Sequence, residues 1–583
     1  MYRPVLDSVG GSLALTALVA MLPLLTLFVL LGVLRMAAWK AAVVSLVISL
    51  LVAVVAYSMP VGQAIMAGVE GAAFGVFPIM WIVINGIWVY NMTVVTGHFD
   101  VLRRSFAKVS DDQRIQAIIV AFCFGALLEA LAGFGTPVAI TSVMLIALGF
   151  KPVKAAVVAL VANTAPVAFG SLAVPITTLA TVTGMPEHPL AQIVGRQTPL
   201  LALFVPMALV FIIDGWRGVR ATLPATLTCG ISFAIAQFVC ANFISTQLTD
   251  IVASLAAGAC LMLLLRVWRP AGTYVEADEV GALETEADTS GASRPGAANR
   301  PSPEMATART AGLPEEPVVP VGVTALELAE RDRLSHDTSS DVFKAYAPYL
   351  IIIAVFSIAQ IPFVKDALAA PTVSFKWPGL DLQSASGKPS TIPTFKFNFF
   401  ASAGTLMVLA GLITIPFIGI SGAKAFKALV GTYIQLKSAI VTVMAVLGLA
   451  YVMNASGQTA TLGKWMAGAG AAFALISPLL GWLGVAVTGS DTSSNSLFGA
   501  LQASAAKQVG LNPFLMAAAN SSGGVLGKMI SPQNLAIAAA AVSMSGKEGI
   551  IFRKVLGWSL GFVFFMCVIV YLQSTSVLSW MLP

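Results

Sequence analysis

The nonapeptide VTGSDTSSN, Val487 to Asn495, holds one aspartate and five hydroxyl side chains. It lies between two apolar segments, with ISPLLGWLG before it and LFGALQASAA after it. A patch this polar in a stretch this apolar indicates an interruption within the membrane-buried part of a chain.

The chain as a whole is apolar, since 57% of its 583 residues are hydrophobic and only 10% are charged. Apolar runs of about 20 residues, the length at which a helix spans a bilayer, recur from end to end. Lipid offers the backbone no hydrogen-bonding partners, and the alternation of an outer-membrane barrel is absent, so these runs predict helices. We therefore expect an all-α polytopic membrane protein whose first apolar run is a retained helix rather than a cleaved signal. The candidate helices cover residues 11–34, 41–59, 72–97, 154–184, 196–213, 222–245, 248–268, 345–364, 398–420, 438–455, 511–543 and 555–578.

Two further apolar stretches, 115–149 and 470–506, are interrupted midway. EALAGFGTP, Glu129 to Pro137, breaks the first, and the nonapeptide breaks the second. Each interruption leaves about a dozen residues on either side, fewer than a spanning helix needs. Non-helical backbone at membrane depth is tolerated only where protein buries it or where it lines a wet cavity. The stretches therefore predict two re-entrant hairpins with polar tips facing a site, in addition to about twelve transmembrane helices.

The distribution of basic residues fits this topology. Without the long polar segment after residue 269, loops assigned to the inside hold nineteen Lys and Arg residues, and loops assigned to the outside hold eight, as the positive-inside rule requires. Both termini then fall on the periplasmic side. The basic charges lie at helix ends rather than on one polar face, so nucleic-acid binding is not expected.

The segment 269–342 breaks the apolar pattern. It is rich in Ala, Gly, Pro, Thr and Glu, and residues 270–342 carry 14 of the 27 acidic residues but 5 of the 33 basic ones. This composition predicts a disordered loop, which the topology places in the cytoplasm.

The segments after the two hairpins match each other. In ANTAPVAFGSLAVP (162–175) and ANSSGGVLGKMISP (519–532), the residues Asn, Gly and Pro coincide at identical spacing. Because the hairpins enter from opposite sides, the repeats are inverted, a pattern of secondary transporters. We expect a first repeat over 1–213 with hairpin 115–149 and broken helix 154–184, additional helices over 214–268, and a second repeat over 343–583 with hairpin 470–506 and broken helix 511–543.

Glycine and proline in these segments leave backbone amides and carbonyls free near the membrane midplane. Half-helix N-termini direct positive partial charge at an anion, so a small anion is the expected cargo. The alternative is that Gly, Ser and Asn only let helices pack closely. The five cysteines lack CxxC spacing and the three histidines are scattered, so no protein metal site or cofactor is expected.

Three charged residues fall at predicted membrane depth: Glu129, Asp491 and Lys528. Charge there costs about 2.5 to 3.5 kcal/mol on insertion scales, so a function or a partner is expected for each. Lys528 could attract a substrate carboxylate or neutralise Asp491. Glu129 could carry a proton or serve as a structural hydrogen-bonding partner.

Long motifs now identify a resemblance. The chain resembles the L-lactate permease family of bacterial proton-coupled monocarboxylate transporters over its whole length. The residues that carry this resemblance are FCFGALLEALAGFGTPVAIT (122–141), NTAPVAFG (163–170), VGRQ (194–197), DGWRG (214–218), FAIAQ (233–237), GWLGVAVTGSDTSSNSLFGALQA (481–503) and GKMISPQ (527–533).

The resemblance implies uptake of L-lactate with a proton across the bacterial inner membrane, with D-lactate and glycolate as alternative substrates. It also implies the inverted-repeat, elevator-like architecture of the ion-transporter superfamily, whose members are often homodimers. The insert around 270–342 departs from the family's usual form.

The resulting hypothesis places the carboxylate of lactate between the two hairpin tips and the broken helices. The candidate substrate-binding residues are Gly133, Gly135, Asn163, Ser171, Ser490, Thr492, Ser493, Ser494, Asn520, Ser521 and Lys528, and the candidate proton-coupling residues are Glu129 and Asp491. A sodium-coupled carboxylate transporter, with Asp491 as a sodium ligand, is the main alternative. An intramembrane hydrolase using the two acids, or a channel or sensor of the same topology, is also open at this stage.

Overall fold

A computed structural model describes residues 1–34, 36–107, 110–133, 135–270, 272–275, 337–383, 390, 393–545 and 547–583. The predicted disordered loop 269–342 therefore lies largely outside the described residues. The described chain is mostly helical, as expected for an all-α polytopic membrane protein.

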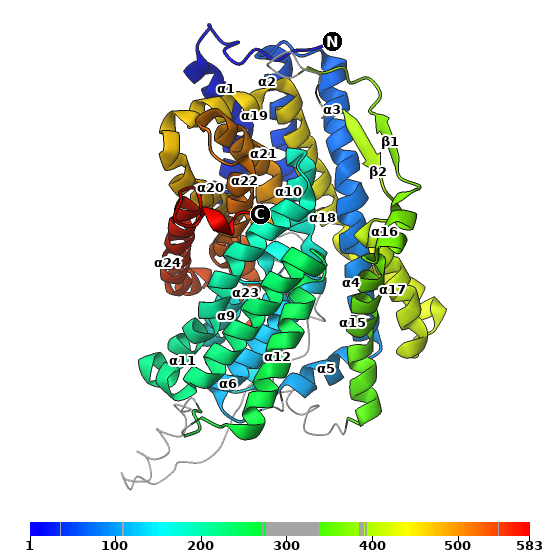
Figure 1. The fold of residues 1–583 in the computed structure, drawn as a ribbon, viewed down its shortest axis with the longest axis vertical. Helices are drawn as coiled ribbons and strands as arrows, with labels where there is room; N and C mark the ends of the chain where they lie inside the picture. Colours follow the sequence, from blue (N-terminus) through cyan, green and yellow to red (C-terminus); the bar gives the residue numbers. More distant parts are fainter. Residues whose placement is uncertain are drawn as a thin grey trace, which may run out of the picture.

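The helices follow one another closely along both halves of the chain (Figure 1). In the first half they are α1 (Leu13–Phe28), α2 (Ala38–Val55), α3 (Val61–Phe74), α4 (Trp81–Val95), α5 (His98–Ala107), α6 (Gln113–Ala117), α7 (Gly125–Leu131), α8 (Thr136–Ala147), α9 (Pro152–Ala162), α10 (Gly170–Thr183), α11 (Glu187–Val239) and α12 (Thr249–Val267). In the second half they are α15 (Ser339–Ala359), α16 (Pro362–Ala369), α17 (Ala403–Phe417), α18 (Gly422–Ser456), α19 (Gln458–Met466), α20 (Phe473–Thr488), α21 (Asp491–Val509), α22 (Pro513–Gly527), α23 (Pro532–Ala541) and α24 (Glu548–Gln573).

Ten helical segments of the described chain are long and apolar enough to cross a membrane, or eleven if α9 and the segment Val167–Thr183 count as one bent span. The sequence predicted about twelve. The difference arises partly because two predicted helices form one helical segment over Glu187–Ile244, and because α17 has only 15 residues, fewer than the ~20 of a spanning helix.

Both predicted interruptions are turns between helices. The first runs from the end of α7 to Gly135, and Gly133 and Gly135 both have positive φ. The second is Gly489 and Ser490, between α20 and α21. The arms of the second pair have 16 and 19 residues, which is longer than the dozen that the sequence predicted.

The segments after the two turns are broken helices, as predicted. The pair formed by α9 and Val167–Thr183 bends by 63°, and Ser171, Leu172 and Ala173 in it all have left-handed backbone conformations. In the second half, a short turn over Lys528–Ile530 and the extended Ser531 separate α22 from α23. The two breaks are therefore equivalent in position along the repeat but differ in backbone geometry.

Helices α20, α21 and α22 pack tightly together, and α10 from the first half lies against α21 (Figure 1). Three glycines allow the close approach of α20 and α22: a Cβ on Gly481 would meet the backbone of Asn520, and one on Gly523 or Gly527 would meet the backbone of α20. The amide of Asn495 on α21 donates to the carbonyl of Pro175 on α10 at 3.0 Å. This bond ties the second turn to the first broken helix.

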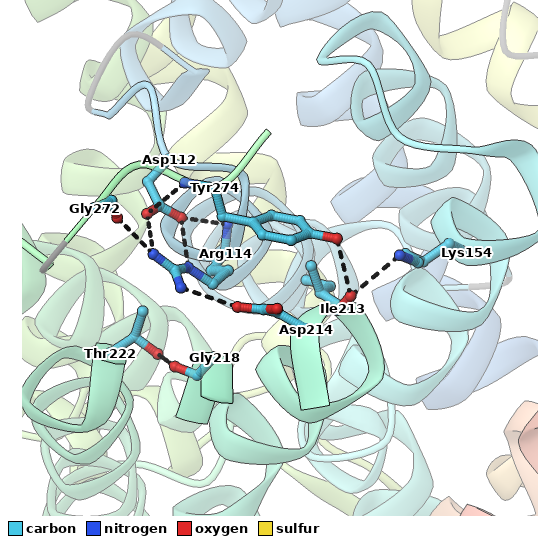
Figure 2. A network of polar contacts seen from close by, with 9 residues as sticks. All are labelled: Asp112, Arg114, Lys154, Ile213, Asp214, Gly218, Thr222, Gly272 and Tyr274. Carbon is cyan, nitrogen blue, oxygen red and sulfur yellow. Dashed lines mark hydrogen bonds and ion pairs between the residues drawn. The ribbon is translucent and has the colours of Figure 1, made fainter. Parts of the chain in front are cut away.

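A buried arginine fixes the start of the long insert (Figure 2). Arg114 forms ion pairs with Asp112 at 2.7 Å and with Asp214 at 3.0 Å, and it donates to the carbonyl of Gly272 at 2.8 Å. Its guanidinium also lies 5.6 Å from the ring centre of Tyr274. The residues that follow α12 are thereby held against α6 and the bend in α11.

A small antiparallel sheet lies against α3. Strands β1 (Val373–Lys376) and β2 (Thr394–Phe397) pair with Val373 opposite Phe397, and the ring of Phe395 packs at a tilt against that of Phe74 with ring centres 4.4 Å apart. Neither strand was predicted from the sequence.

Candidate functional site

A cavity of about 50 Å³ lies where the two halves of the chain meet. This volume exceeds the 10–15 Å³ that one water-sized probe needs. The wall combines residues of α7 and α10 from the first half with residues around the second turn and the second break. They are Glu129, Val167, Gly170, Ser171, Val174, Pro175, Gly489, Ser490, Asp491, Thr492, Lys528 and Gln533.

An ion pair forms one side of this cavity. Nζ of Lys528 lies 2.6 Å from Oε1 of Glu129, and the two side chains are 7% and 3% exposed. Oε2 of Glu129 has no hydrogen-bond partner among the described residues. The sequence left Lys528 to bind a substrate or neutralise Asp491, whereas the structure pairs it directly with Glu129.

The second acid of the cavity has hydrogen bonds on one oxygen only. Oδ2 of Asp491 accepts from the hydroxyl of Ser521 at 2.5 Å and from the amide of Asn495 at 3.4 Å. Oδ1 has no hydrogen-bond partner. Asp491 is the first residue of α21, so its negative charge is favoured by the positive end of that helix.

A buried amide network supports the second turn from behind. Asn520 donates to Asn495 at 2.8 Å and accepts from Gln502 at 2.6 Å. Gln502 in turn accepts from Ser477. These bonds fix the orientation of α21, and with it the position of Asp491 and Ser490 at the cavity wall.

Glycines let the backbone approach the two acids. A Cβ on Gly170 would lie 2.7 Å from Oε1 of Glu129, and one on Gly524 would collide with Oδ1 of Asp491. A Cβ on Gly133 would collide with Oγ of Ser171. Larger residues at these positions would displace the side chains that line the cavity.

The predicted site residues fall into three groups. Six line the cavity: Glu129, Ser171, Ser490, Asp491, Thr492 and Lys528. Two bond to the side chain of a lining residue: Ser521 donates to Asp491, and the backbone amide of Ser493 donates to the hydroxyl oxygen of Ser490. The other five do not line the cavity: Gly133, Gly135, Asn163, Ser494 and Asn520.

The residues of this last group have definite places. Gly133 and Gly135 form the first turn, and a Cβ on Gly135 would meet Ile537 and Asn534 rather than the cavity. Ser494 bonds to the carbonyl of Gly481 at 3.2 Å. Asn163 caps α9 at the first break, with both side-chain polar atoms unpartnered, whereas Asn520 lies inside α22 rather than at a break.

Sequence reasoning missed Gln533, which lines the cavity, and Asn495, which joins the halves. Both lie within the motifs quoted from the sequence: Asn495 follows the selected Ser494 directly, and Gln533 is five residues after the selected Lys528. Their polar side chains at these positions were the available signal.

Several known proteins are similar in sequence to this chain. The model of the family described as L-lactate permease matches residues 16–577. The chain is 40% identical to the L-lactate permease of Bacillus subtilis over all of this chain and 99% of that protein. It is also 40% identical to the glycolate permease GlcA of Escherichia coli, over 98% of this chain and 97% of that one.

The fold has a distant structural counterpart. The solved structure of Neisseria gonorrhoeae MtrF aligns with a TM-score of 0.50 at 12% identity, over 94% of this chain and 97% of that one. The likeness concerns the fold alone. The family match and the full-length relatives, together with the membrane-spanning helices, show that this multi-pass membrane chain belongs to the L-lactate permease family.

Proposed function

We propose that the protein imports L-lactate together with a proton across the bacterial inner membrane, and that D-lactate and glycolate are alternative substrates. The relatives named L-lactate permease and glycolate permease support this proposal, because lactate and glycolate share a carboxylate with an adjacent hydroxyl. The long insert lies on the cytoplasmic side in this proposal and both termini on the periplasmic side.

The Lys528–Glu129 ion pair in the cavity wall carries the proposal. The ammonium group of Lys528 can bind the carboxylate of a substrate once Glu129, its partner in the ion pair, has lost its negative charge. Protonation of Glu129 removes that charge and releases the ammonium of Lys528 for the carboxylate of lactate. The proton and the substrate therefore bind together.

This exchange adds no net charge to the site. Lactate replaces the charge that Glu129 loses on protonation, so the pair with Lys528 persists with a new partner. A neutral load avoids electrical work of about 2.3 kcal/mol per charge per 100 mV of membrane potential. It also avoids leaving Lys528 buried without a counter-charge, which is strongly destabilising in proteins.

The hydroxyl-rich wall supplies the remaining contacts. Ser171, Ser490 and Thr492 line the cavity, and their hydroxyl groups can donate to or accept from the 2-hydroxyl of lactate. Oδ1 of Asp491, which has no partner, is a further acceptor for that hydroxyl. Asp491 thus serves as a specificity residue or as a second proton carrier.

The proposed transport mechanism needs an architecture of two inverted repeats. We assign them to residues 1–213 and 343–583, with additional helices over 214–268. The turns at Gly133 and Gly489 and the two breaks support it, because each occurs at a corresponding place in the two halves. We propose that the two helix–turn–helix units are re-entrant hairpins and that the site moves with them in an elevator-like manner, in a homodimer.

The test is radiolabelled L-lactate uptake by purified protein in liposomes with the membrane potential clamped at zero. For a coupling ratio of one proton per lactate, an inward gradient of one pH unit supports about tenfold accumulation, since one unit corresponds to about 1.36 kcal/mol. An inward sodium gradient at equal pH supports none. Accumulation driven by sodium, or the absence of any lactate uptake, would contradict the proposal.

Unlabelled D-lactate and glycolate should compete with this uptake, and acetate, which lacks the hydroxyl, should compete less well. Recovery of unmodified lactate from the liposomes distinguishes transport from hydrolysis or another conversion. Stoichiometric accumulation against a gradient distinguishes a transporter from a channel.

A further inference from the structure

A third buried acid lies behind the candidate site, on α12. Asp250 is fully buried and is the second residue of this helix. Its Oδ1 accepts from the side-chain amide of Gln237 at 3.0 Å, and its Oδ2 has no hydrogen-bond partner. No ion pair to Asp250 exists among the described residues, so its buried charge has no cationic neighbour to stabilise it.

Asp250 is near the acid that we assign to proton coupling. Helix α12 packs against α7, which carries Glu129. The other titratable group close to Asp250 is Cys240, which precedes α12. From α11 the neutral amide of Gln237 meets Asp250, and α10 carries no titratable residue.

Hydrogen-bonding groups connect Asp250 to the first break. Gln237, its amide partner, also lies 3.5 Å from the carbonyl of Ala165 in that break. Next to this carbonyl, Asn163 is 5% exposed and both its side-chain polar atoms are unpartnered. Oε2 of Glu129 is unpartnered as well. Buried polar atoms normally have partners, so unpartnered atoms on three neighbouring segments need an explanation.

The residue before Asp250 begins a series of hydrogen bonds that ends at the half-buried Glu187. The hydroxyl of this residue, Thr249, donates to the carbonyl of Ser245, whose own hydroxyl bonds to Gln247 at 3.2 Å. Gln247 donates to Oε1 of Glu187 at 2.7 Å, at the first residue of α11. This end of α12 is about 28 Å from the end that leads into the insert, given 19 residues at 1.5 Å each.

We propose that Asp250 is a proton-relay residue that passes protons between the Glu187 end of α11 and Glu129. This inference rests on the proposed function and extends it. Protonated Asp250 gives its proton to the Glu129 carboxylate, so that Asp250 becomes the carboxylate and Glu129 the neutral acid. The Asp250 carboxylate then takes a proton from the aqueous side opposite the insert. No other bond is made or broken.

The test compares two modes of transport in the same liposomes. Proton-driven accumulation needs net proton movement, whereas exchange of internal for external lactate does not. In Asp250→Asn, the proton-driven accumulation rate should fall by about tenfold or more, the scale at which loss of one proton-transfer group is felt. Exchange should stay within about threefold of the wild type, because Asn keeps the size of Asp250 and an acceptor for Gln237.

Thr198→Val is the matched control. The hydroxyl of Thr198 donates to Gln237 at 3.2 Å, so this variant disturbs the same buried network without removing an acid. It should change accumulation and exchange in equal proportion. A pH-sensitive dye trapped in the liposomes measures protons moved with lactate, and Asp250→Asn should slow the dye signal in step with accumulation.

Two outcomes overturn the relay: wild-type accumulation by Asp250→Asn, or an equal loss of accumulation and exchange. If Asp250→Asn does not fold, Asp250→Glu replaces it. That variant keeps an acid but changes its distance from its neighbours. The pH dependence of its accumulation should therefore change, whereas that of its exchange should not. An unchanged pH dependence of accumulation would likewise overturn the relay. Failure of the proposed function itself is distinguished by the wild-type protein, which would then show no proton-driven accumulation.

Discussion

Nζ of Lys528 lies 2.6 Å from Oε1 of Glu129, and the two residues are 399 positions apart in the chain. The pair therefore links a helix before the first turn to the second break. Removing one partner of a buried ion pair destabilises a protein more than replacing both, because the remaining charge is left buried and unpaired. The site and the packing of the two halves thus depend on the same contact.

The first prediction concerns the stability of this pair. Glu129→Met and Lys528→Met should each lower the free energy of unfolding by about 3 to 5 kcal/mol, because each leaves a buried charge unpaired. The double variant should cost less than the sum of the two. Thermal unfolding in detergent, monitored by size-exclusion chromatography, ranks the wild type and the three variants by stability. Additive losses would show that the two side chains do not act as a pair.

The second prediction separates the two acids of the cavity in transport. Glu129→Gln should lose proton-driven accumulation by about 100-fold but retain lactate exchange, because Glu129 is the acid that competes with the substrate for Lys528. Asp491→Asn is the comparison. It keeps an acceptor for Ser521, so its accumulation should fall less than that of Glu129→Gln. The reverse order would assign the coupling proton to Asp491.

A third prediction tests the first turn. Gly133 has a φ of 54°, and a Cβ there would collide with Oγ of Ser171. Gly133→Ala should therefore raise the KM for lactate as well as destabilise the protein. Gly510→Ala is the control, since Gly510 also has positive φ but no atom lies within 4 Å of its Cβ position. It should cost about 1 to 2 kcal/mol of backbone strain without changing KM.

The left-handed turn at the first break leads to a fourth prediction. Ala173 has a φ of 60°, a conformation that glycine adopts without steric cost. Ala173→Gly should therefore raise the free energy of unfolding by up to about 1 kcal/mol. Ala518→Gly, in the interior of α22, should instead lower it by about 1 kcal/mol. Thermal melting of the two variants should shift in opposite directions, and a shared downward shift would refute the assigned backbone geometry.

The fifth prediction addresses the glycines between α20 and α22. Gly523→Ala places a Cβ against the backbone of Pro478, and rigid backbone gives way poorly, so we expect a loss of folded protein. Gly557→Ala on α24 meets no atom within 4 Å. It should be neutral or stabilising by about 1 kcal/mol, as expected from helix propensity alone. Equal yields of folded protein from the two variants would contradict the close packing.

Sequence alone located the two turns and the two breaks, because glycine, proline and polar residues in apolar runs leave few other conformations. It also selected six of the residues that line the cavity, because they are polar or charged residues in otherwise apolar segments. The pairing of Lys528 with Glu129 could not be predicted, since it depends on how two distant segments cross.

Segment lengths were harder to predict than segment positions. α18 has 35 residues, whereas the apolar run predicted 438–455. Its first part contains three lysines, and helix formation there depends on hydrogen bonds and packing rather than on hydrophobicity. β1 and β2 are four residues each, too short for a clear alternation, and the sheet that they form packs against α3 through the tilted ring contact of Phe395 with Phe74.

The extreme N-terminal residues matter for how the protein is handled in the laboratory. The backbone of Tyr2 bonds to Asp381 and Gln383, and its hydroxyl donates to the carbonyls of Tyr57 and Ser456. Affinity tags or fluorescent proteins fused in front of Met1 would crowd this buried anchor, which lies apart from the cavity. Pro583 is exposed, so a purification handle or reporter belongs after that residue.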